Sequence, residues 1–342
     1  MARFSGLSGG TVPANTNVLV STTLPKLQKS VVDNFFTATP FFFWFREKNR
    51  VSTWDRGDTL EIPIMYDEAP GAKSYLSYET LDVKPPQGIT TSIWALSKYR
   101  IPILYSRSMA NANSGESAIV NLIQTLKDQA QLSLVRAVNT DLFQDVKVTA
   151  QGAQDINSLY HLVEETPAAS QVATPGGISK STYTWWRHQY NTIGSATSGI
   201  LEAVRELYMN CSNGSDTPDL ALCDDYTYIN LENKLQSSVR FVNPRAVDWG
   251  FENVTYKGMT IMYDKSIGDD AHDADGDGTL FMLNTKYLKL WLGADANFRI
   301  VSPEWDFKQD CYLGGILVDL QVTCSNMGRQ GILQGGAWAS AA

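Results

Sequence analysis

The chain has 342 residues, of which 43% are hydrophobic and 19% charged, a composition typical of a globular protein and not of a fibrous or disordered one. Its formal net charge of −8 excludes a nucleic-acid coat held by electrostatics over its whole surface, because phosphate binding needs clustered Lys and Arg. The aromatic content, 13 Phe, 15 Tyr and 9 Trp, is high for so few charges, so we expect much aromatic surface to be hidden in a core or between subunits.

The N-terminal stretch predicts an extended basic arm. Residues 1–20 are rich in Gly, Ser, Thr and Asn and show no hydrophobic period, so we expect them to be ordered only where a partner grips them. Residues 1–32 contain three basic residues and no acid, a local charge of +3. They lack the run of roughly 7–15 apolar residues that a secretory signal needs, so we expect folding in a cytoplasm. Helical spacing of apolar residues predicts a short helix over 22–36.

Five consecutive aromatic residues, Phe41–Phe45, come next. They fit a membrane-inserting or ligand-stacking element, or a buried or interface anchor. We favour the anchor because charged residues follow directly and the run is far shorter than the ~20 residues that span a bilayer. We therefore predict no membrane contact.

Residues 51–106 are expected to form strands. Leu60, Ile62 and Ile64 alternate with other residues, and Pro63 limits that strand to an edge or a bulge. Between this strand and two later ones at 89–96 and 99–105 lies the polar stretch 67–87. It carries acids, prolines and tyrosines that we expect to be exposed, and it has no core of its own. We therefore expect a β-arm that lies against another molecule. Its acids and tyrosines are Asp67, Glu68, Glu79, Asp82, Tyr75 and Tyr78.

The clearest helical pattern spans Glu116–Phe143, with apolar residues on one face at helical spacing. At 1.5 Å per residue it predicts a rod of about 40 Å. The region that follows is loop-rich to residue 179. A helix at 199–209, a strand at 218–223 and a helix at 224–235 then predict a small α/β layer. The last third favours strands: a hairpin at 254–263 and strands at 280–283, 287–292, 298–301 and 316–323.

The densest acidic cluster lies at 269–277, where Asp273, Asp275 and Asp277 match the start of a calcium-binding loop. The position that should carry a bidentate Glu is Asn284, and the flanking residues favour strands. We therefore interpret the cluster as a solvated turn and predict no resident metal. A weak calcium site is the alternative, and its candidate ligands are Asp273, Asp275 and Asp277.

Nothing in the sequence indicates an enzyme. Nucleotide-binding and nucleophile-elbow motifs are absent, the histidines are isolated, and we predict no catalytic residue and no cofactor. Four cysteines lie 12, 88 and 13 positions apart, which matches no zinc pattern, so we interpret them as packing residues in a reducing compartment. They are Cys211, Cys223, Cys311 and Cys324.

The stretch from Tyr183 to His188 concentrates aromatic and basic residues, including Trp185, Trp186 and Arg187. One interpretation is a stacking platform for a sugar or base, with Arg187 as a phosphate clamp. The other is an anchor that holds the preceding Gly-Gly loop to a helix or subunit, with Arg187 in buried polar bonds. We favour the anchor because the flanks carry no basic patch.

This stretch, with other short motifs, resembles the major capsid proteins of tailed bacteriophages. The matches lie, in order, at Gly57–Pro63, Pro175–Tyr183 with Trp186-Arg187, Gly250-Phe251, Tyr256–Gly258 with Asp264, Leu283–Thr285, and Ser325-Asn326 with Gly331–Leu333. Each motif is short, but their order and spacing cover nearly the full chain.

The resemblance implies an α+β fold with an N-terminal arm, an extended β-loop, a peripheral domain with a long spine helix and a β-sheet, and an axial α/β domain at a symmetry axis. By analogy these parts occupy 1–45 (arm and short helix), 46–106 (extended β-loop), 107–150 (peripheral domain with the spine helix), 151–240 (axial domain) and 241–342 (return to the peripheral domain and β-rich C-terminal segment).

The function implied is that of a capsid protein assembling into hexamers and pentamers of an icosahedral head around double-stranded DNA. Expected partners are other copies, neighbouring capsomers, portal and decoration proteins, and DNA by weak non-specific contact. No long charged helical segment precedes the arm, so we expect either a separate scaffolding protein or a chain that is already mature. The expected location is the virion capsid, assembled in the host bacterial cytoplasm. The assembly contacts that we expect are Tyr75, Tyr78, Trp185, Trp186 and Arg187.

Two alternatives stay open. A nanocompartment shell of similar fold would enclose protein cargo instead of a genome. A calcium-dependent carbohydrate-binding module would instead use Trp185, Trp186 and the loop from Asp273 to Asp277.

Overall fold

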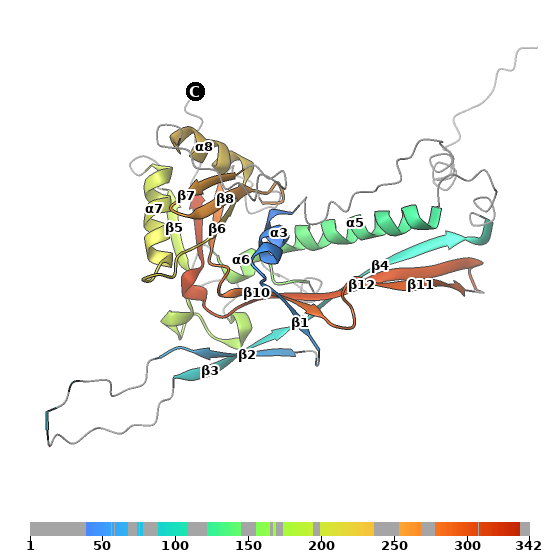
Figure 1. Ribbon diagram of the computed structural model, residues 1–342, viewed down its shortest axis with the longest axis horizontal. Helices are drawn as coiled ribbons and strands as arrows, with labels where there is room; N and C mark the ends of the chain where they lie inside the picture. Colours follow the sequence, from blue (N-terminus) through green and yellow to red (C-terminus); the bar gives the residue numbers. More distant parts are fainter. Residues whose placement is uncertain are drawn as a thin grey trace, which may run out of the picture. The chain divides into compact units, whose positions relative to one another are not determined.

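The computed structural model describes residues 39–55, 57, 59–67, 74, 76–77, 88–108, 122–144, 155–164, 167–168, 174–193, 199–235, 253–267, 278–306 and 308–335. The predicted arm and the helix at 22–36 lie outside these residues. The described residues group into two compact units (Figure 1). The first draws on Arg100–Val135 and Phe298–Leu317, and the second on Phe35–Tyr99, Arg136–Asn297 and Val318–Ala342.

The second unit is built on a six-stranded mixed sheet. Its strands, in spatial order, are β5 (Gln189–Ile193), β13 (Gly331–Gly335), β9 (Thr279–Leu283), β6 (Leu220–Cys223), β8 (Met259–Tyr263) and β7 (Asn253–Tyr256). The β5–β13 and β6–β8 pairs are parallel and the other pairs antiparallel. All four residues of β6 are buried, because an inner strand of a covered sheet meets apolar groups on both faces.

Two helices pack on this sheet, α7 (Ile200–Cys211) and α8 (Asp225–Leu235) (Figure 1). Apolar residues of α7 at helical spacing, such as Val204 and Leu207, face the core. Asp224 directly precedes α8 and caps its first turn, because its Oδ2 accepts from the Thr227 N–H at 3.3 Å. The predicted strand at 218–223 and both helices are therefore confirmed.

The predicted hairpin is also confirmed, as β7 and β8 joined by Lys257-Gly258. Both turn residues have positive φ, 49° and 87°, which matches the right-handed twist of the flanking strands. Four strands of this sheet come from 241–342, the range that we expected to return to the peripheral domain. In the structure β7, β8, β9 and β13 lie in one sheet with β5 and β6.

The aromatic run Phe41–Phe45 lies in helix α3 (Pro40–Glu47), and all five rings are at most 4% exposed. Trp44 donates its indole N–H to Asp219 Oδ2 at 3.3 Å. The same carboxylate accepts from the Thr285 N–H at 2.8 Å. The interpretation of this run as a buried anchor is confirmed, and the anchor attaches to the strand region next to β6.

A two-stranded antiparallel ribbon pairs β2 (Thr59–Met65) with β3 (Ile89–Ala95). Pro63 lies in this ribbon, where β2 pairs with β3 alone among the described strands, so its prediction as an edge residue is confirmed. One face of the ribbon buries Leu60, Ile64 and Trp94. The other face is exposed, since the burial alternates along both strands.

The second unit also contains β1 (Val51–Trp54), which pairs in parallel with β10 (Leu288–Gly293). β10 in turn pairs antiparallel with Leu320–Cys324 of β12 (Cys311–Cys324). The buried amide of Gln321 accepts from the Asn157 N–H at 2.8 Å and ties the segment before the four-residue helix α6 (Leu159–Leu162) to this sheet.

In the first unit β11 (Arg299–Asp306) pairs antiparallel with β12, with a bulge between Val301 and Glu304. β4 (Ser97–Ser106) also pairs with β12. Tyr105 and Tyr312 stack at 5.1 Å between ring centroids. The helix α5 (Leu122–Phe143) confirms the predicted long helix up to its end at Phe143; the expected first turn lies outside the described residues. The α+β class is confirmed, and all four cysteines are buried and free.

Candidate interaction site at the Trp185–Trp186 turn

The segment from Pro175 to Arg187 begins with a tight turn that only glycine fits. Gly176 and Gly177 have φ of 64° and 77°. A β-carbon on Gly176 would lie 2.8 Å from Cζ2 of Trp94 and 3.1 Å from the β-carbon of Ser92. The turn therefore packs directly against the buried face of β3, whose Trp94 indole is held by the Ser92 hydroxyl at 3.0 Å.

Trp186 holds the same turn from the other end of the segment. Its side chain is fully buried, and its indole N–H donates to the carbonyl of Pro175 at 3.0 Å. This geometry supports the interpretation of the aromatic stretch as an anchor for the Gly-Gly loop, here within one chain. Because its side chain is buried in the folded turn, Trp186 cannot contact a partner directly and can only hold the neighbouring residues in position.

Arg187 is engaged with the backbone of the turn. Its Nε donates to Lys180 O at 2.8 Å and its Nη2 to Ser181 O at 2.9 Å. The guanidinium thus connects two backbone carbonyls of the turn. The Arg187 side chain is half-buried. The polar bonds that we expected for Arg187 are present, although the bond to Ser181 is exposed.

Trp185 lies on the outer side of this anchor. Its ring stacks on Tyr66 at the end of β2, with centroids 5.0 Å apart and planes 11° apart. Tyr183 flanks it at 5.8 Å. Tyr66 is 37% exposed and Tyr183 47%, so the three rings form an aromatic wall that solvent reaches.

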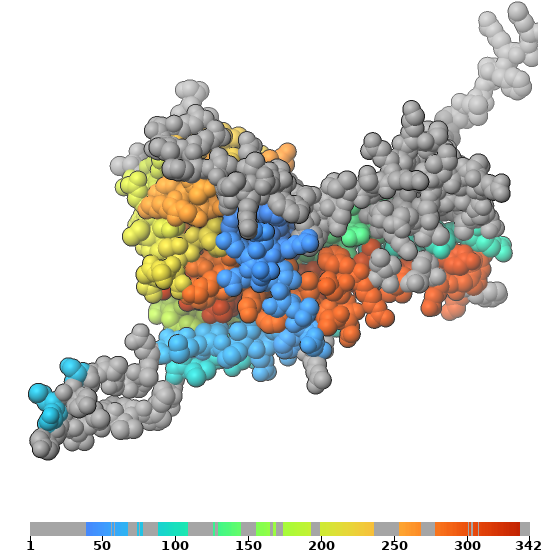
Figure 2. Space-filling model, in the orientation of Figure 1, coloured from blue at the N-terminus to red at the C-terminus, as the bar shows by residue number. Residues whose placement is uncertain are grey.

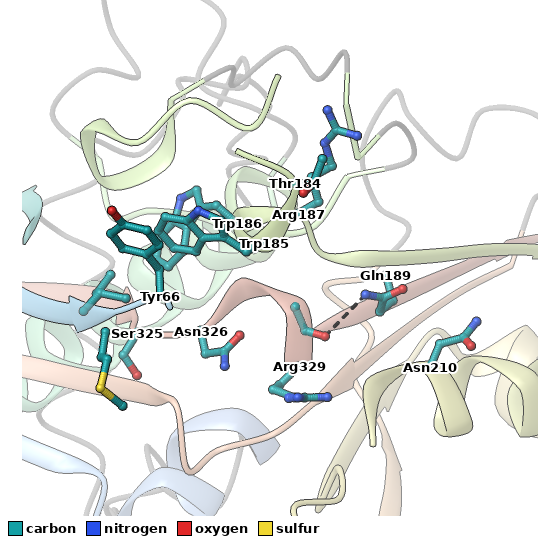
Figure 3. Close-up of a pocket in the computed structure, with 13 residues that line it drawn as sticks. Tyr66, Thr184, Trp185, Trp186, Arg187, Gln189, Asn210, Ser325, Asn326 and Arg329 are labelled. Carbon is teal, nitrogen blue, oxygen red and sulfur yellow. Dashed lines mark hydrogen bonds between the residues drawn. The ribbon is translucent and has the colours of Figure 1, made fainter. Parts of the chain in front are cut away.

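This aromatic wall borders an open pocket of about 330 Å³. Its lining residues are Ile64, Met65, Tyr66, Thr184, Trp185, Trp186, Arg187, Gln189, Asn210, Ser325, Asn326, Gly328 and Arg329. Figure 3 shows the Tyr66–Trp185 stack on one side of the pocket, Arg329 across from it, and the Arg187 side chain directed away from Arg329. None of these lining residues is an acid and two are arginines, so the lining residues carry a positive formal charge on a chain with a net charge of −8.

A rigid segment carries Arg329. Met327 and Gln330 on either side of it are fully buried. The Gln330 side chain exchanges two hydrogen bonds with the backbone of Asn284, at 2.9 and 3.1 Å. A β-carbon on Gly331 would lie 2.7 Å from Cys211 Sγ, so the segment is also pressed against α7. The backbone that presents Arg329 is therefore fixed.

Behind the turn lies a buried group of ionisable side chains, Lys180, Glu164 and His188. Burial lowers the pKa of Lys180 to about 8, although the charge of Glu164 opposes this shift. Burial, together with the charge of Lys180, lowers the pKa of His188 to about 3. The Glu164 N–H donates to His188 Nε2 at 3.0 Å, which suits a neutral imidazole. The anchor thus rests on a neutral histidine at neutral pH.

The other predicted site residues lie elsewhere. Tyr75, Tyr78, Asp273, Asp275 and Asp277 are outside the described residues. Within the described ranges, no three His, Cys, Asp or Glu side chains gather as metal ligands do. None of the described helices has both the length and the apolar character needed to cross a bilayer.

Sequence reasoning missed Tyr66 and Arg329 as members of this site. Tyr66 belongs to the end of a predicted strand, and Arg329 to the closing segment that the family resemblance marked only by its flanks. Their proximity to Trp185 depends on pairings across more than a hundred residues, which no local pattern reveals.

No family model matches the sequence, and no curated protein matches it either. Solved structures do match. The cyanophage A-1(L) capsid asymmetric unit gives a TM-score of 0.64 at 14% identity over 90% of this chain and 95% of the other. The capsid of a native GTA particle gives 0.58 at 10% identity over 96% and 99%. The holo encapsulin complex from Synechococcus elongatus gives 0.54 at 8% identity over 92% and 94%.

Proposed function

Because the chain has the fold of tailed-phage capsid proteins, we propose that it is a structural shell subunit. In this proposal it is a major capsid protein that assembles into hexamers and pentamers and encloses double-stranded DNA in an icosahedral head. The same chain then makes similar heterologous contacts within and between rings, and closure of the shell buries its exposed edges.

The observation that carries this proposal, besides the fold, is the exposed face of the β2–β3 ribbon. Met65 is 79% exposed, Ile89 74% and Ile93 51%, on two strands that pair only with each other among those described. Figure 2 shows both strands at the molecular surface, in light blue and cyan. Contiguous exposed apolar side chains on a ribbon mark an interaction surface. A neighbouring copy that covers this face would remove the cost of its exposure.

Both edges of the ribbon favour the same conclusion. The outer strand edges present backbone N–H and C=O groups that another chain can pair with, and Pro63 blunts only one of them. We therefore propose that the loop 46–106 overlaps a neighbouring subunit by strand and aromatic contacts. Tyr75 and Tyr78 in that loop, and Trp185 and Arg187 beside the pocket, remain our proposed assembly contacts, with Trp186 as their buried support.

The domain assignment is a proposal of the same kind. We assign 1–45 to an arm, 46–106 to the extended loop, 107–150 with the spine helix to the peripheral domain, and 151–240 to the axial domain. The six-stranded sheet supports including β7, β8, β9 and β13 in the axial part, so the return to the peripheral domain within 241–342 is confined to the remaining strands.

The remaining partners follow from the same model. Scaffolding, portal and decoration proteins and neighbouring capsomers would bind the chain during assembly in the host cytoplasm, and the product would be the virion capsid. The net charge of −8 would keep packaged DNA mobile, while the basic stretch 1–32 offers weak, non-specific contact. We propose no catalytic role, no cofactor and no membrane partner.

A nanocompartment shell is the second candidate, favoured by the match to the encapsulin complex. Purified particles would separate the two functions: nuclease-protected DNA inside supports the phage head, and a defined protein cargo without DNA supports the compartment.

Electron microscopy of the purified full-length chain tests the shared part of both proposals. We expect closed icosahedral particles with rings of five and six copies. Monomers at all concentrations, which bind glycans and release them in chelator, would instead indicate the carbohydrate-binding module.

A further inference from the structure

The pocket beside Trp185 has an unmatched cation. Arg329 makes no hydrogen bond and no ion pair with any described residue. It helps to lower the pKa of Asp216, but only after Lys286 and Tyr287, which hydrogen-bond to that carboxylate. Lys286 Nζ lies 2.5 Å from Asp216 Oδ1, and Tyr287 donates to Oδ2 at 2.7 Å. Asp216 thus has a hydrogen-bonding partner on each oxygen, and Arg329, which donates to none of the described residues, keeps its five donors for another acceptor.

The surroundings of Arg329 favour one chemical class of ligand. The side-chain amides of Asn210 and Asn326 line the same pocket without a hydrogen-bond partner among the described residues. The Tyr66–Trp185 stack supplies a flat apolar wall opposite. A guanidinium, two amides and an aromatic wall suit a carboxylate next to an aromatic or aliphatic side chain. A single free cation is too little for a nucleic-acid backbone, which needs several.

We propose that this pocket of one copy receives the acidic segment 67–87 of a second copy, with a segment carboxylate on Arg329. The inference rests on the proposed function, because it requires contact between copies. Charge complementarity supports it: the segment carries Asp67, Glu68, Glu79 and Asp82 against two lysines. The segment also supplies apolar groups for the wall, since Leu76 is 81% exposed and Tyr75 and Tyr78 flank it.

Strand pairing favours a second copy over the same chain as the donor. Tyr66 N–H donates to Gly88 O at 2.9 Å, so the two ends of the segment are still paired where they leave the ribbon. Tyr66 itself lines the pocket. To occupy its own pocket, the segment would have to reverse direction immediately beyond this pair.

A charge exchange in full-length chains tests the proposal. Arg329→Glu gives one chain a repelling pocket, and Glu79→Lys with Asp82→Lys gives another a repelling segment. We expect each variant alone to raise the concentration needed for ring formation by about tenfold or more. Mixed in equal amounts they should form rings again, because each pocket then meets an oppositely charged segment of the other chain. Arg205→Glu, an exposed change on α7, is the control and should assemble like the parent.

Three outcomes would overturn the proposal. Normal ring formation by Arg329→Glu would show that the pocket is not used. No rescue in the mixture, with rescue only when all three changes are in one chain, would show that each chain fills its own pocket. If Arg329→Glu lost ring formation and circular dichroism showed that the variant is unfolded, Arg329 would have a role in stability alone.

A second measurement does not depend on assembly. A labelled synthetic peptide of residues 67–87 should bind the parent chain, measured by fluorescence anisotropy below the assembly concentration, and bind Arg329→Glu about tenfold more weakly. A DNA oligonucleotide that displaces the peptide would indicate a nucleic-acid site instead. If the parent forms no particles, the proposed shell function is wrong, and peptide binding still decides this inference.

Discussion

The ring of Trp94 lies against Gly176 so closely that a β-carbon there would be 2.8 Å from Cζ2 of the indole. This contact joins the β2–β3 ribbon to the turn that carries the aromatic wall. It is buried on both sides, since Trp94 is 3% exposed and Gly176 is buried. The ribbon and the candidate site therefore share one packing contact.

Gly176→Ala should destabilise the chain by about 2 kcal/mol or more, because the new methyl group meets Trp94 and the residue has φ of 64°. Gly177→Ala is the matched control: φ is 77°, but no atom lies within 4 Å of the new group. It should cost only about 1 kcal/mol for the backbone conformation. Urea unfolding measures both, and equal losses would contradict the packing role of Trp94.

Substitutions at the neighbouring residues Trp185 and Trp186 should have different effects: one should reduce assembly and the other the stability of the fold. Trp186→Phe removes the donor to the buried Pro175 carbonyl and should lower the free energy of unfolding by about 1–3 kcal/mol. Trp185→Ala removes a ring from the exposed wall and should cost less than about 1 kcal/mol, while it reduces particle yield. Denaturation and light scattering measure the two effects. If Trp185→Ala assembled like the parent, the aromatic wall would not be an assembly contact.

Acid should destabilise the chain through His188. Its pKa is about 3 in the folded chain against an ordinary value of 6.5, so the unfolded chain binds the proton first as the pH falls. Stability is complete above about pH 6.5 and should drop by about 2–3 kcal/mol by pH 4.5. His188→Gln should show a shallower loss between these values, even if it is less stable at pH 7.

The buried carboxyls Asp224 and Asp264 change stability in the opposite direction. Burial raises the pKa of each, so acid relieves the cost of their ionised forms in the folded chain. Both are present in the parent and in His188→Gln, so the difference between the two unfolding curves reports His188. Parallel curves would show that His188 is not the acid-sensitive group.

The segment 67–87 can be shortened without disturbing the ribbon. Because Tyr66 and Gly88 are hydrogen-bonded at 2.9 Å, an Asn-Gly turn in place of 67–87 should close the hairpin. We expect a folded chain with unchanged unfolding behaviour that forms no particles. If this variant formed heads of normal size, the assignment of 46–106 as the overlapping loop would be wrong.

The exposed face of the ribbon should matter for assembly alone. Ile89→Lys places a charge at a side chain that is 74% exposed, so the stability of the single chain should change by less than about 0.5 kcal/mol. Particle yield should fall sharply, because the charge would be buried against a neighbour. Ser133→Lys, at an exposed position of α5, is the control. Sedimentation compares the particle yields of the two variants, and equal yields would mean that no copy covers this face of the ribbon.

Local patterns predicted most of the individual elements. Alternation over Leu60, Ile62 and Ile64 predicted β2, and helical spacing predicted α7 and the end of α5, because these periods depend only on which side chains one element buries. β5 and β13 were not predicted. Each is short, and each owes its place to parallel or antiparallel partners far along the chain, so neither has a distinctive period.

The sequence by itself determined that this chain is an α+β protein with buried aromatic anchors, a glycine turn before Trp186 and an acid-rich loop. Only the tertiary structure decided that Tyr66 stacks on Trp185, that Arg329 lies across from them without a partner, and that strands after residue 241 join the sheet of β6. The physical reason is that side-chain periodicity records burial, whereas the choice of burial partner is made by strand pairings over long separations, which leave no local signature.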